Sequence, residues 1–378
     1  MASLRIVGVS PAADVSDWRE PLPEGKWSQF FGALAARVEV IDVVSPQLSK
    51  RESYLNLLRW VAPDRARWLA RAGFNQSFVA KVNGALERQL TARAGGFDLI
   101  VQMQTLCSPR SASVRAPYVI YTDNTMALTQ RHRPASALIP PGMLADWLAF
   151  ETRVCQDAEA VFTFSEFARA SVLEDYGCAP ERVLAVGTGA NQHLPEPAPA
   201  PDGPPRVLFI GREFERKGGR VLLEAWGHVH AQHPEAELLI AGPRQDPAAG
   251  VALGVRYLGR LSRAQLAEQY RGASVFVLPS LFEPWGFVFI EAMGYGLPCV
   301  GADCCAMPEI IDADTTGLLA APGDAQSLAD AILTLLADPG RARAMGRAGH
   351  AKALERYTWG RVADRVLDHL GALPTAGA

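Results

Sequence analysis

Two glutamates eight positions apart are the first candidates for chemistry in this chain: Glu283 and Glu291, within LFEPWGFVFIEAMGYGLPCVG (residues 281–301). The proline after Glu283 disfavours helical dihedral angles, so we expect Glu283 in a loop and Glu291 inside a short helix. The expected amino end of that helix holds three residues: Gly286, Phe287 and Val288. N–H groups at a helix amino end bind phosphate, and carboxylates accept hydrogen bonds from hydroxyls. A nucleotide-sugar carries both kinds of group.

Two cations lie in a second segment, RVLFIGREFERKGGRVLLEAW (residues 206–226). Arg212 and Lys217 follow an apparent strand and precede an apparent helix. Arginine offers phosphate a planar fork of donors, and lysine offers a mobile point charge. Placed beside a diphosphate, both would stabilise the negative charge that builds as the bond from sugar to phosphate breaks.

Each of these groups also has an ordinary structural interpretation. Glu283 could be a turn residue and Glu291 a surface helix carboxylate, because exposed glutamates are common. Arg212 and Lys217 could lie in a solvated loop, since charged residues separate them: Glu213, Glu215 and Arg216. We favour ligand binding because the two pairs occur together and the glutamates lie in an otherwise uncharged segment.

The elements that position these groups are strands alternating with helices. Short apolar runs separated by helical patterns predict βαβ units and a parallel sheet, whose ligands bind beyond the carboxyl ends of the strands. In the second half of the chain we predict strands at residues 206–211, 236–242, 255–259, 274–280 and 297–301. In the first half we predict strands at residues 4–10, 37–45, 98–104, 116–123 and 160–166, and a closing strand within 177–191.

Six prolines among residues 195–205 mark the clearest domain boundary, because such a run favours extended geometry. We therefore predict an N-terminal domain (1–195), a linker (196–205), a C-terminal domain (206–358) and a final helical segment (359–378).

Composition is that of a soluble globular protein, with 378 residues, 49% hydrophobic and 20% charged. A net charge of −3 argues against a nucleic-acid binder. No apolar run approaches the ~20 residues that span a bilayer, and the first residues lack a secretory signal. The six cysteines show no CxxC or zinc-like spacing, although Cys304 and Cys305 are adjacent. We expect a cytoplasmic protein without a metal site.

These segments, with VRYLGRLSRAQLAEQYRGASVFVLPSLFEPWGF (residues 255–287), resemble the large family 4 of retaining glycosyltransferases. The match covers most of residues 206–360, whereas the N-terminal half matches loosely. The resemblance implies an α/β chain of GT-B architecture: two Rossmann-like domains facing each other across a cleft, with the last helix crossing back to the first domain. It also implies sugar transfer with retention at the anomeric carbon, without a cofactor.

The resemblance assigns roles to individual residues. It places Glu291 on the ribose hydroxyls, Glu283 near the transferred sugar, and Arg212 and Lys217 on the diphosphate. The other donor-binding residues that it implies are Gly211, Gly286, Phe287, Val288, Arg260 and Leu261. The implied front-face route passes the acceptor's proton to the departing phosphate. No DxD motif occurs in the donor region, consistent with a metal-independent reaction.

Two departures concern the acceptor side. Relatives often carry a Gly-Gly loop after the first strand; here Gly25 and Lys26 are the candidates to substitute for it. Relatives often place His-Asp after the fourth strand, where this chain has Thr122 and Asp123. Asp123 is thus either a turn residue or an acceptor contact.

Residues 50–93 form a basic segment with nine Lys or Arg and three acids, a local charge of +6 that leaves −9 for the remainder. Basic helices with interleaved aromatic residues can lie on anionic membranes. Alternatively, they form a pair of inserted helices whose aromatic side chains pack inward while the cations face water. The interleaved aromatic residues are Trp60, Trp68, Phe74 and Phe78.

Two other functions remain open at this point. A nucleotide-sugar 2-epimerase shares the two-domain architecture, but it needs acid and base residues that we do not identify in the first domain. A non-catalytic nucleotide-sugar-binding module is the other alternative. The sequence does not name the sugar, the base or the acceptor.

Overall fold

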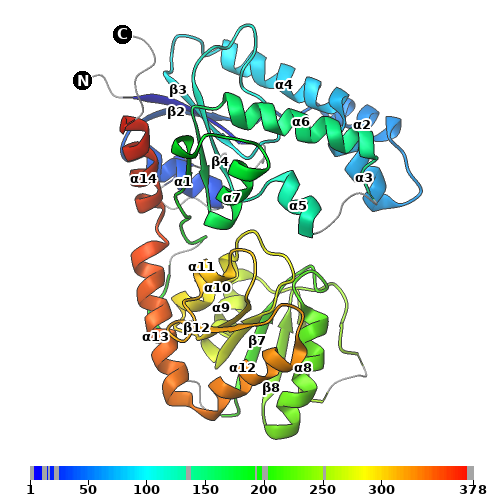
Figure 1. The fold of residues 1–378 in the computed structure, drawn as a ribbon, viewed down its shortest axis with the longest axis vertical. Coiled ribbons are helices and arrows are strands. Elements are labelled where there is room, and N and C mark those ends of the chain that lie inside the picture. The colour runs from blue at the N-terminus through cyan, green and yellow to red at the C-terminus, as the bar shows by residue number, and fades with distance from the viewer. Residues whose placement is uncertain are drawn as a thin grey trace. The chain divides into compact units, whose positions relative to one another are not determined.

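The computed structural model describes residues 4–10, 15, 18–20, 25–132, 138–191, 194–197, 203–249 and 253–372. The chain forms two compact units. The N-terminal unit comprises Met1–Gly189 with Trp359–Ala378, and the C-terminal unit comprises Ala190–Thr358 (Figure 1). Much of the proline-rich linker, at residues 198–202, lies outside the described residues.

The N-terminal unit contains a six-stranded parallel sheet in the order β2-β1-β3-β4-β5-β6. Strands β3, β4 and β5 are buried along their whole length, as expected for a parallel sheet covered on both faces. The strands are β1 (Arg5–Val9), β2 (Glu39–Val44), β3 (Leu99–Met103), β4 (Tyr118–Thr122), β5 (Ala160–Thr163) and β6 (Val183–Ala185). All six lie within the segments that the sequence predicts.

Helices of this unit include one that comes from the far end of the chain. Helix α14 (Trp359–Ala372) packs on α1 (Lys26–Ala35), where the rings of Trp359 and Phe30 lie 6.0 Å apart. An ion pair between Arg37, which follows α1, and Asp364 of α14 adds to this contact. The other helices are α2 (Lys50–Arg59), α3 (Arg65–Gly73), α4 (Gln76–Thr91), α5 (Met126–His132), α6 (Pro141–Asp157) and α7 (Glu166–Glu174).

The basic segment 50–93 forms three helices, α2, α3 and α4, where the sequence led us to expect a pair. Short polar side chains start the second and third helices. Asp64 accepts a hydrogen bond from the N–H of Arg67, and Asn75 accepts one from the N–H of Phe78. Such N-caps satisfy the free N–H groups at a helix start, so they divide one basic run into separate helices.

The C-terminal unit contains a second six-stranded parallel sheet in the order β12-β11-β10-β7-β8-β9. This is the doubly wound order typical of Rossmann folds, with β7 as the first strand. Its strands are β7 (Arg206–Ile210), β8 (Glu237–Ala241), β9 (Val255–Gly259), β10 (Val275–Leu278), β11 (Cys299–Ala302) and β12 (Gly317–Ala320). Its helices are α8 (Gly219–Gln232), α9 (Arg263–Gly272), α10 (Phe287–Gly294), α11 (Met307–Ile310), α12 (Ala325–Ala337) and α13 (Pro339–Arg356).

The strand order of this second sheet reverses between β7 and β10, which pair side by side. In open α/β sheets, ligands bind beyond the carboxyl ends of the strands at such a reversal. The segment after β7 carries Arg212 and Lys217, and the segment after β10 carries Glu283. The topology thus brings both charged segments to one edge of one sheet. Within the described ranges, no helix is long and apolar enough to cross a bilayer.

Candidate active site

A cavity of about 390 Å³ lies at the carboxyl edge of the C-terminal sheet. Its lining comes from the ends of β7 and β8, the loop before α8, the loop after β9 and the start of α10. Six of the residues implied for the donor line it: Gly211, Arg212, Lys217, Arg260, Leu261 and Val288. Segments up to 78 residues apart in the chain, from Ile210 to Val288, therefore meet in one concave surface, at the place where the topology predicts a ligand.

Glu283 is buried, with 7% of its surface exposed, yet it carries a carboxylate. A buried charge is tolerated when it is paired and hydrogen-bonded. The Nζ atom of Lys217 lies 2.7 Å from its Oε2 atom, and Nη1 of Arg216 lies 3.3 Å away. The hydroxyl of Ser280 donates a third hydrogen bond, at 3.4 Å. The loop after β10 is thereby fixed to the segment that precedes α8.

Arg216 is a member of this cluster that the sequence did not single out. Besides Glu283, its guanidinium donates to the carbonyl oxygen of Phe282 (2.6 Å) and pairs with Glu213. Burial acts to lower the pKa of Arg216, but the carboxylates of Glu283 and Glu213 raise it overall. In the sequence it follows Glu213 and Glu215, as a residue of a solvated loop would, and only the fold shows that its side chain contacts the buried Glu283.

Glu291 lies on α10 with its carboxylate largely withdrawn from solvent. The hydroxyl of Tyr270, on α9, donates a hydrogen bond of 3.0 Å to its Oε2 atom. Burial raises the pKa of Glu291, although Tyr270, Arg263 and Lys217 each act to lower it. Tyr270 is a second residue that the sequence did not identify, because a lone tyrosine 21 positions away carries no signal of this contact.

The amino end of α10 is built as the sequence predicts. The helix begins at Phe287 with Gly286 as its N-cap, and no side chain caps it. A Cβ atom at Gly286 would lie 2.6 Å from the ring of Phe289, so this position has no room for a side chain. Glu283 precedes the helix in a loop and Glu291 lies within it, so both local predictions are confirmed.

Tight glycine contacts close the base of the site. Gly242 has a φ of 113°, and a Cβ atom there would lie 2.7 Å from the backbone of Gly211. Gly218, the N-cap of α8, has a φ of 70°, and its Cβ atom would lie 1.9 Å from the carbonyl oxygen of Pro279. The loops after β7, β8 and β10 can approach one another this closely because these positions lack side chains.

Two arginines of the cavity have no partner among the residues that the structure describes. Arg212 and Arg260 are exposed, and across the described part of the chain neither makes a hydrogen bond or an ion pair. They differ in this from Lys217 and Arg216, whose charges are directed to Glu283. Guanidinium groups at the edge of a cavity suit an anionic ligand.

Two adjacent thiols contact the same loop. Cys305 has a φ of 55°, and its sulfur accepts a hydrogen bond from the backbone N–H of Glu283. A hydrogen bond from Cys304, together with that N–H, lowers the pKa of Cys305 to about 7. The carbonyl oxygen of Ser280, 3.5 Å from the sulfur of Cys304, is the alternative acceptor for that single S–H group. Among the described residues, no group of three His, Cys, Asp or Glu side chains is placed to hold a metal ion.

The residues considered for the acceptor side belong to the N-terminal unit. Nζ of Lys26 lies 3.2 Å from Oδ2 of Asp123, and it also lies over the ring of Trp27 at 4.3 Å. Gly25 is the N-cap of α1, with a φ of 86°. Most of the loop that precedes Gly25, including residues 11–14, 16–17 and 21–24, lies outside the described residues.

Two Rossmann-like units with these strand orders define the GT-B class of glycosyltransferase folds. Sucrose-phosphate synthase from Thermosynechococcus elongatus superposes with a TM-score of 0.70 at 22% identity, over 98% of this chain and 100% of that one. HepE of Anabaena, solved with UDP and glucose, gives a TM-score of 0.65 at 15% identity, over 98% and 100%. The predicted fold class is confirmed.

Residues 204–338 match the family described as "Glycosyl transferases group 1". Alpha-maltose-1-phosphate synthase of Mycolicibacterium smegmatis is 31% identical over 258 residues, which are 60% of this chain. The match spans 65% of that relative, less than two thirds of its length. The resemblance seen in the sequence is therefore confirmed, and it is strongest in the unit that carries the cavity.

Proposed function

We propose that this chain is a retaining glycosyltransferase that moves a sugar from a nucleotide-diphosphate donor to a hydroxyl acceptor. One observation carries the proposal: Lys217 and Arg216 hold the buried Glu283 at the point where the strand order reverses. The exposed, unpaired Arg212 lines the adjoining cavity. Cations for a diphosphate and a carboxylate for a sugar hydroxyl thus lie side by side.

The remaining donor contacts in this proposal are those that the family resemblance implies. Glu291 would accept hydrogen bonds from the ribose hydroxyls, while Arg260 and Leu261 would border the base. The N–H groups at the start of α10 would face phosphate oxygens, aided by the helix dipole. HepE, which shares the fold, is solved with UDP and glucose, and this supports a nucleotide-sugar as the donor class.

The proposed reaction takes place on one face of the sugar. The bond from the anomeric carbon to the phosphate oxygen breaks, and the acceptor oxygen forms its new bond on that same face. The departing phosphate takes the acceptor's proton. Arg212 and Lys217 would stabilise the charge that grows on the diphosphate, which lowers the barrier more than it strengthens ground-state binding. This route uses no metal ion or organic cofactor.

The acceptor is a glycan, a lipid-linked sugar or a small hydroxylated molecule. The ion pair between Lys26 and Asp123 is the candidate acceptor contact. Both side chains are partly exposed; Lys26 is the first residue of α1, and Asp123 directly follows β4. A carboxylate there would accept a hydrogen bond from an acceptor hydroxyl.

The test is turnover of a panel of UDP-, GDP- and ADP-sugars, with release of nucleoside diphosphate as the readout. One donor should be hydrolysed slowly alone and faster with a matched acceptor, and NMR of the product should show the donor's anomeric configuration. A product of opposite configuration would exclude retention. Recovery of an isomerised nucleotide-sugar would indicate an epimerase, and binding without turnover would indicate a binding module.

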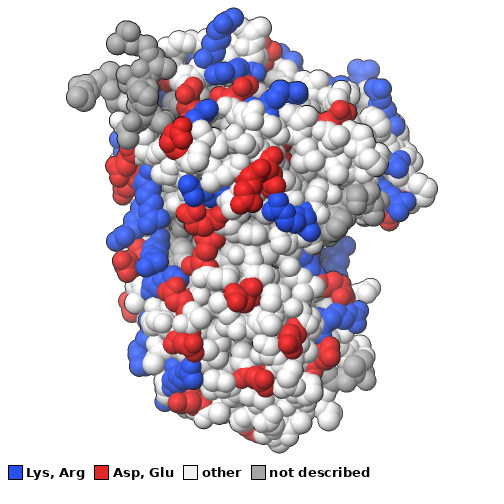
Figure 2. All heavy atoms as spheres, viewed as in Figure 1, with Lys and Arg blue, Asp and Glu red and all other residues white. Residues whose placement is uncertain are grey.

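We also propose that the N-terminal unit contacts anionic membranes through α2 and α3. Figure 2 shows Lys and Arg atoms along the surface where Figure 1 places these helices. Large apolar side chains are exposed beside them, among them Tyr54 (63%), Leu55 (51%) and Val61 (61%). Cations next to exposed apolar residues on short helices are typical of peripheral membrane binding.

The aromatic residues named from the sequence are not the exposed ones. The indole of Trp68 donates to the carbonyl of Leu57 at 2.6 Å, and Phe74 packs on Trp147 with ring centroids 4.7 Å apart. Trp68 and Phe74 therefore stabilise the helices through contacts inside the protein. Sedimentation with anionic and neutral vesicles at low salt tests the proposal: the chain should pellet with anionic vesicles only, and replacing Leu55 and Val61 by serine should abolish this. No pelleting with either vesicle would remove the proposal.

A further inference from the structure

Another cavity in the C-terminal unit, of about 420 Å³, lies at the amino edge of the same sheet. Residues that directly precede three strands line it: Pro205 before β7, Ser274 before β10 and Pro298 before β11. The candidate active site lies at the carboxyl edge, one strand length of ~13 Å away along the four residues of β10. The two cavities are therefore separate sites on one sheet.

The floor of this cavity is apolar. Val275 and Leu297 line it from the sheet side, and Leu335 and Leu336 line it from the carboxyl end of α12. All four side chains are at most 8% exposed, so they form a firm, well-packed surface. A concave apolar surface of this size suits the apolar part of a small molecule.

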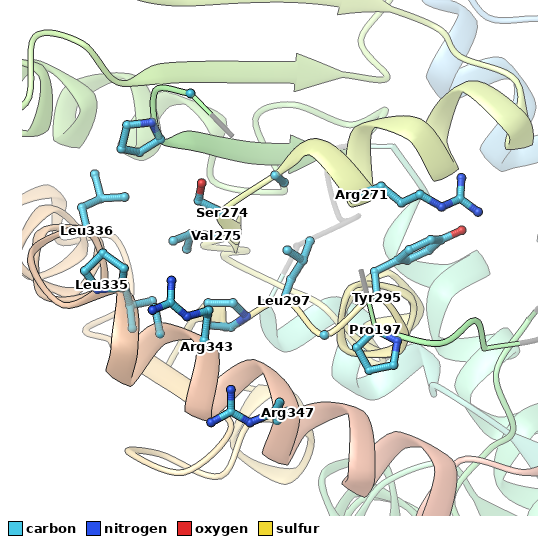
Figure 3. Close-up of a pocket in the computed structure, with 17 residues that line it drawn as sticks. Pro197, Arg271, Ser274, Val275, Tyr295, Leu297, Leu335, Leu336, Arg343 and Arg347 are labelled. Carbon is cyan, nitrogen blue, oxygen red and sulfur yellow. The ribbon is translucent and has the colours of Figure 1, made fainter. Parts of the chain in front are cut away.

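Three guanidinium groups stand around that floor: those of Arg271, Arg343 and Arg347 (Figure 3). None of the 17 residues that line the cavity is Asp, Glu or Lys. In Figure 3, Arg271 lies beside Tyr295, while Arg343 extends from α13 on the side where Leu335 lies. The cavity is thus strongly cationic in a chain whose net charge is −3.

Helix electrostatics explain only one of these arginines. Arg271 occupies the last turn of α9, where the helix dipole favours a cation. Arg343 lies near the amino end of α13, where the dipole offers it no stabilisation, and Arg347 lies one turn further on. Like charges four residues apart on a helix repel each other. Within the described part of the chain, neither the Arg343 nor the Arg347 side chain forms a hydrogen bond or an ion pair.

We propose that this cavity binds an amphipathic phosphate monoester, a site distinct from the donor site. The phosphate bridges Arg343 and Arg347, which removes their mutual repulsion and uses the fork geometry of guanidinium groups. The apolar part is an alkyl chain lying on the leucines. A stacked nucleobase fits less well, because Tyr295 already stacks on Tyr270 (5.0 Å) and lies beside Arg271.

The test is calorimetric titration of the full chain with n-octyl phosphate, kept below its micelle-forming concentration. We expect one saturable site per chain. Neutral n-octyl glucoside and inorganic phosphate should each bind at least about tenfold more weakly. The glucoside lacks the phosphate that would contact the arginines, and inorganic phosphate lacks the alkyl chain that would contact the leucines. Equal binding of either control, or no binding of n-octyl phosphate at millimolar concentration, would overturn the proposal.

Variants at Arg343 and Arg347 test whether n-octyl phosphate binds in this cavity. The double substitution Arg343→Ala/Arg347→Ala should weaken n-octyl phosphate binding at least about tenfold, and both side chains are exposed, so folding should be retained. Arg341→Ala is the matched control: it lies on the same helix, pairs with Asp314 and does not line the cavity. Saturating UDP should leave binding unchanged. Unaltered affinity in the double variant, or displacement by UDP, would show that the ligand binds elsewhere.

Discussion

The ammonium group of Lys217 lies 2.7 Å from the carboxylate of Glu283, across 66 residues of sequence. Both side chains are nearly buried, at 13% and 10% exposed. The pair joins the loop after β7 to the loop after β10, which flank the reversal in strand order. A donor diphosphate that draws Lys217 toward itself would therefore also act on the carboxylate proposed to face the sugar.

Replacing Lys217 by alanine should lower kcat about 100-fold, because a preorganised cation at a developing charge is lost. The fold should survive, since Arg216 still pairs with Glu283. The measurement is steady-state release of nucleoside diphosphate. Arg220→Ala is the control, because Arg220 is exposed on α8 and pairs with Glu215 rather than with Glu283. Wild-type turnover in the Lys217 variant would refute the role assigned to this residue.

Glu291→Gln should stabilise the unliganded protein and weaken donor binding. Burial raises the pKa of Glu291 above its ordinary 4.5, so the folded state holds this proton more tightly than the unfolded state does. The free energy of unfolding therefore falls as the pH rises from 4.5 through the raised pKa. Glutamine does not titrate, so the variant should lack this decline.

Denaturant unfolding of both proteins across that pH range measures the effect, and titration with the identified donor measures the loss of affinity. Glu268→Gln, an exposed site on α9, supplies the control and should follow the wild-type curve. Parallel pH curves for wild type and Glu291→Gln would show that the buried carboxylate does not titrate as inferred.

Cys305 should be the most reactive thiol of the chain near neutral pH. Its pKa is lowered to about 7 by hydrogen bonds from Cys304 and the N–H of Glu283, and the thiolate is the nucleophile. The rate of alkylation by iodoacetamide should rise with a midpoint at about pH 7. Burial raises the pKa of Cys107 to about 12, so that thiol should remain unmodified.

Peptide mapping by mass spectrometry identifies the alkylated residue, and Cys305→Ser should remove the reactive phase. Alkylation should also reduce donor turnover, because the added group lies against the loop of Glu283. A midpoint near the ordinary value of 9.0 would contradict the inferred environment of this thiol.

Gly218, the N-cap of α8, and Gly227, within that helix, should respond to alanine in opposite ways. At Gly218, the positive φ and the 1.9 Å approach of the Pro279 carbonyl make Gly218→Ala destabilising by about 3 kcal/mol. Gly227 lies mid-helix with no neighbour within 4 Å of an added Cβ, so Gly227→Ala should stabilise by about 0.5–1 kcal/mol. Thermal unfolding compares the two, and similar melting shifts would contradict the packing described here.

Buried strands were predictable because residues such as those of β4 and β10 form continuous apolar runs between turn signals. Strand β12 was not predicted. Its four residues, Gly317–Ala320, contain no β-branched or aromatic side chain, so nothing in the local sequence favours an extended strand. It forms because β11 offers it a free edge.

The residues of the candidate site also divide into those that the sequence could identify and those that it could not. Residues in the recognisable segments, such as Arg212 and Glu291, could be singled out from sequence. Arg216 and Tyr270 could not, because their roles depend on partners 67 and 21 residues away. The cationic cavity at the amino edge also had no sequence signal, since Arg343 and Arg347 resemble any exposed helical pair until the fold places them beside leucines.

Helix α14 follows the entire C-terminal unit in the chain but packs into the N-terminal unit against α1. During translation, residues 190–358 are synthesised before α14 leaves the ribosome. The N-terminal unit is therefore the first to be started and the last to be completed. Until then, Phe30 lacks the indole of Trp359, and Arg37 lacks Asp364. The nascent N-terminal unit therefore exposes an apolar surface until synthesis ends. This exposed surface makes it the part of the nascent chain that most needs a chaperone.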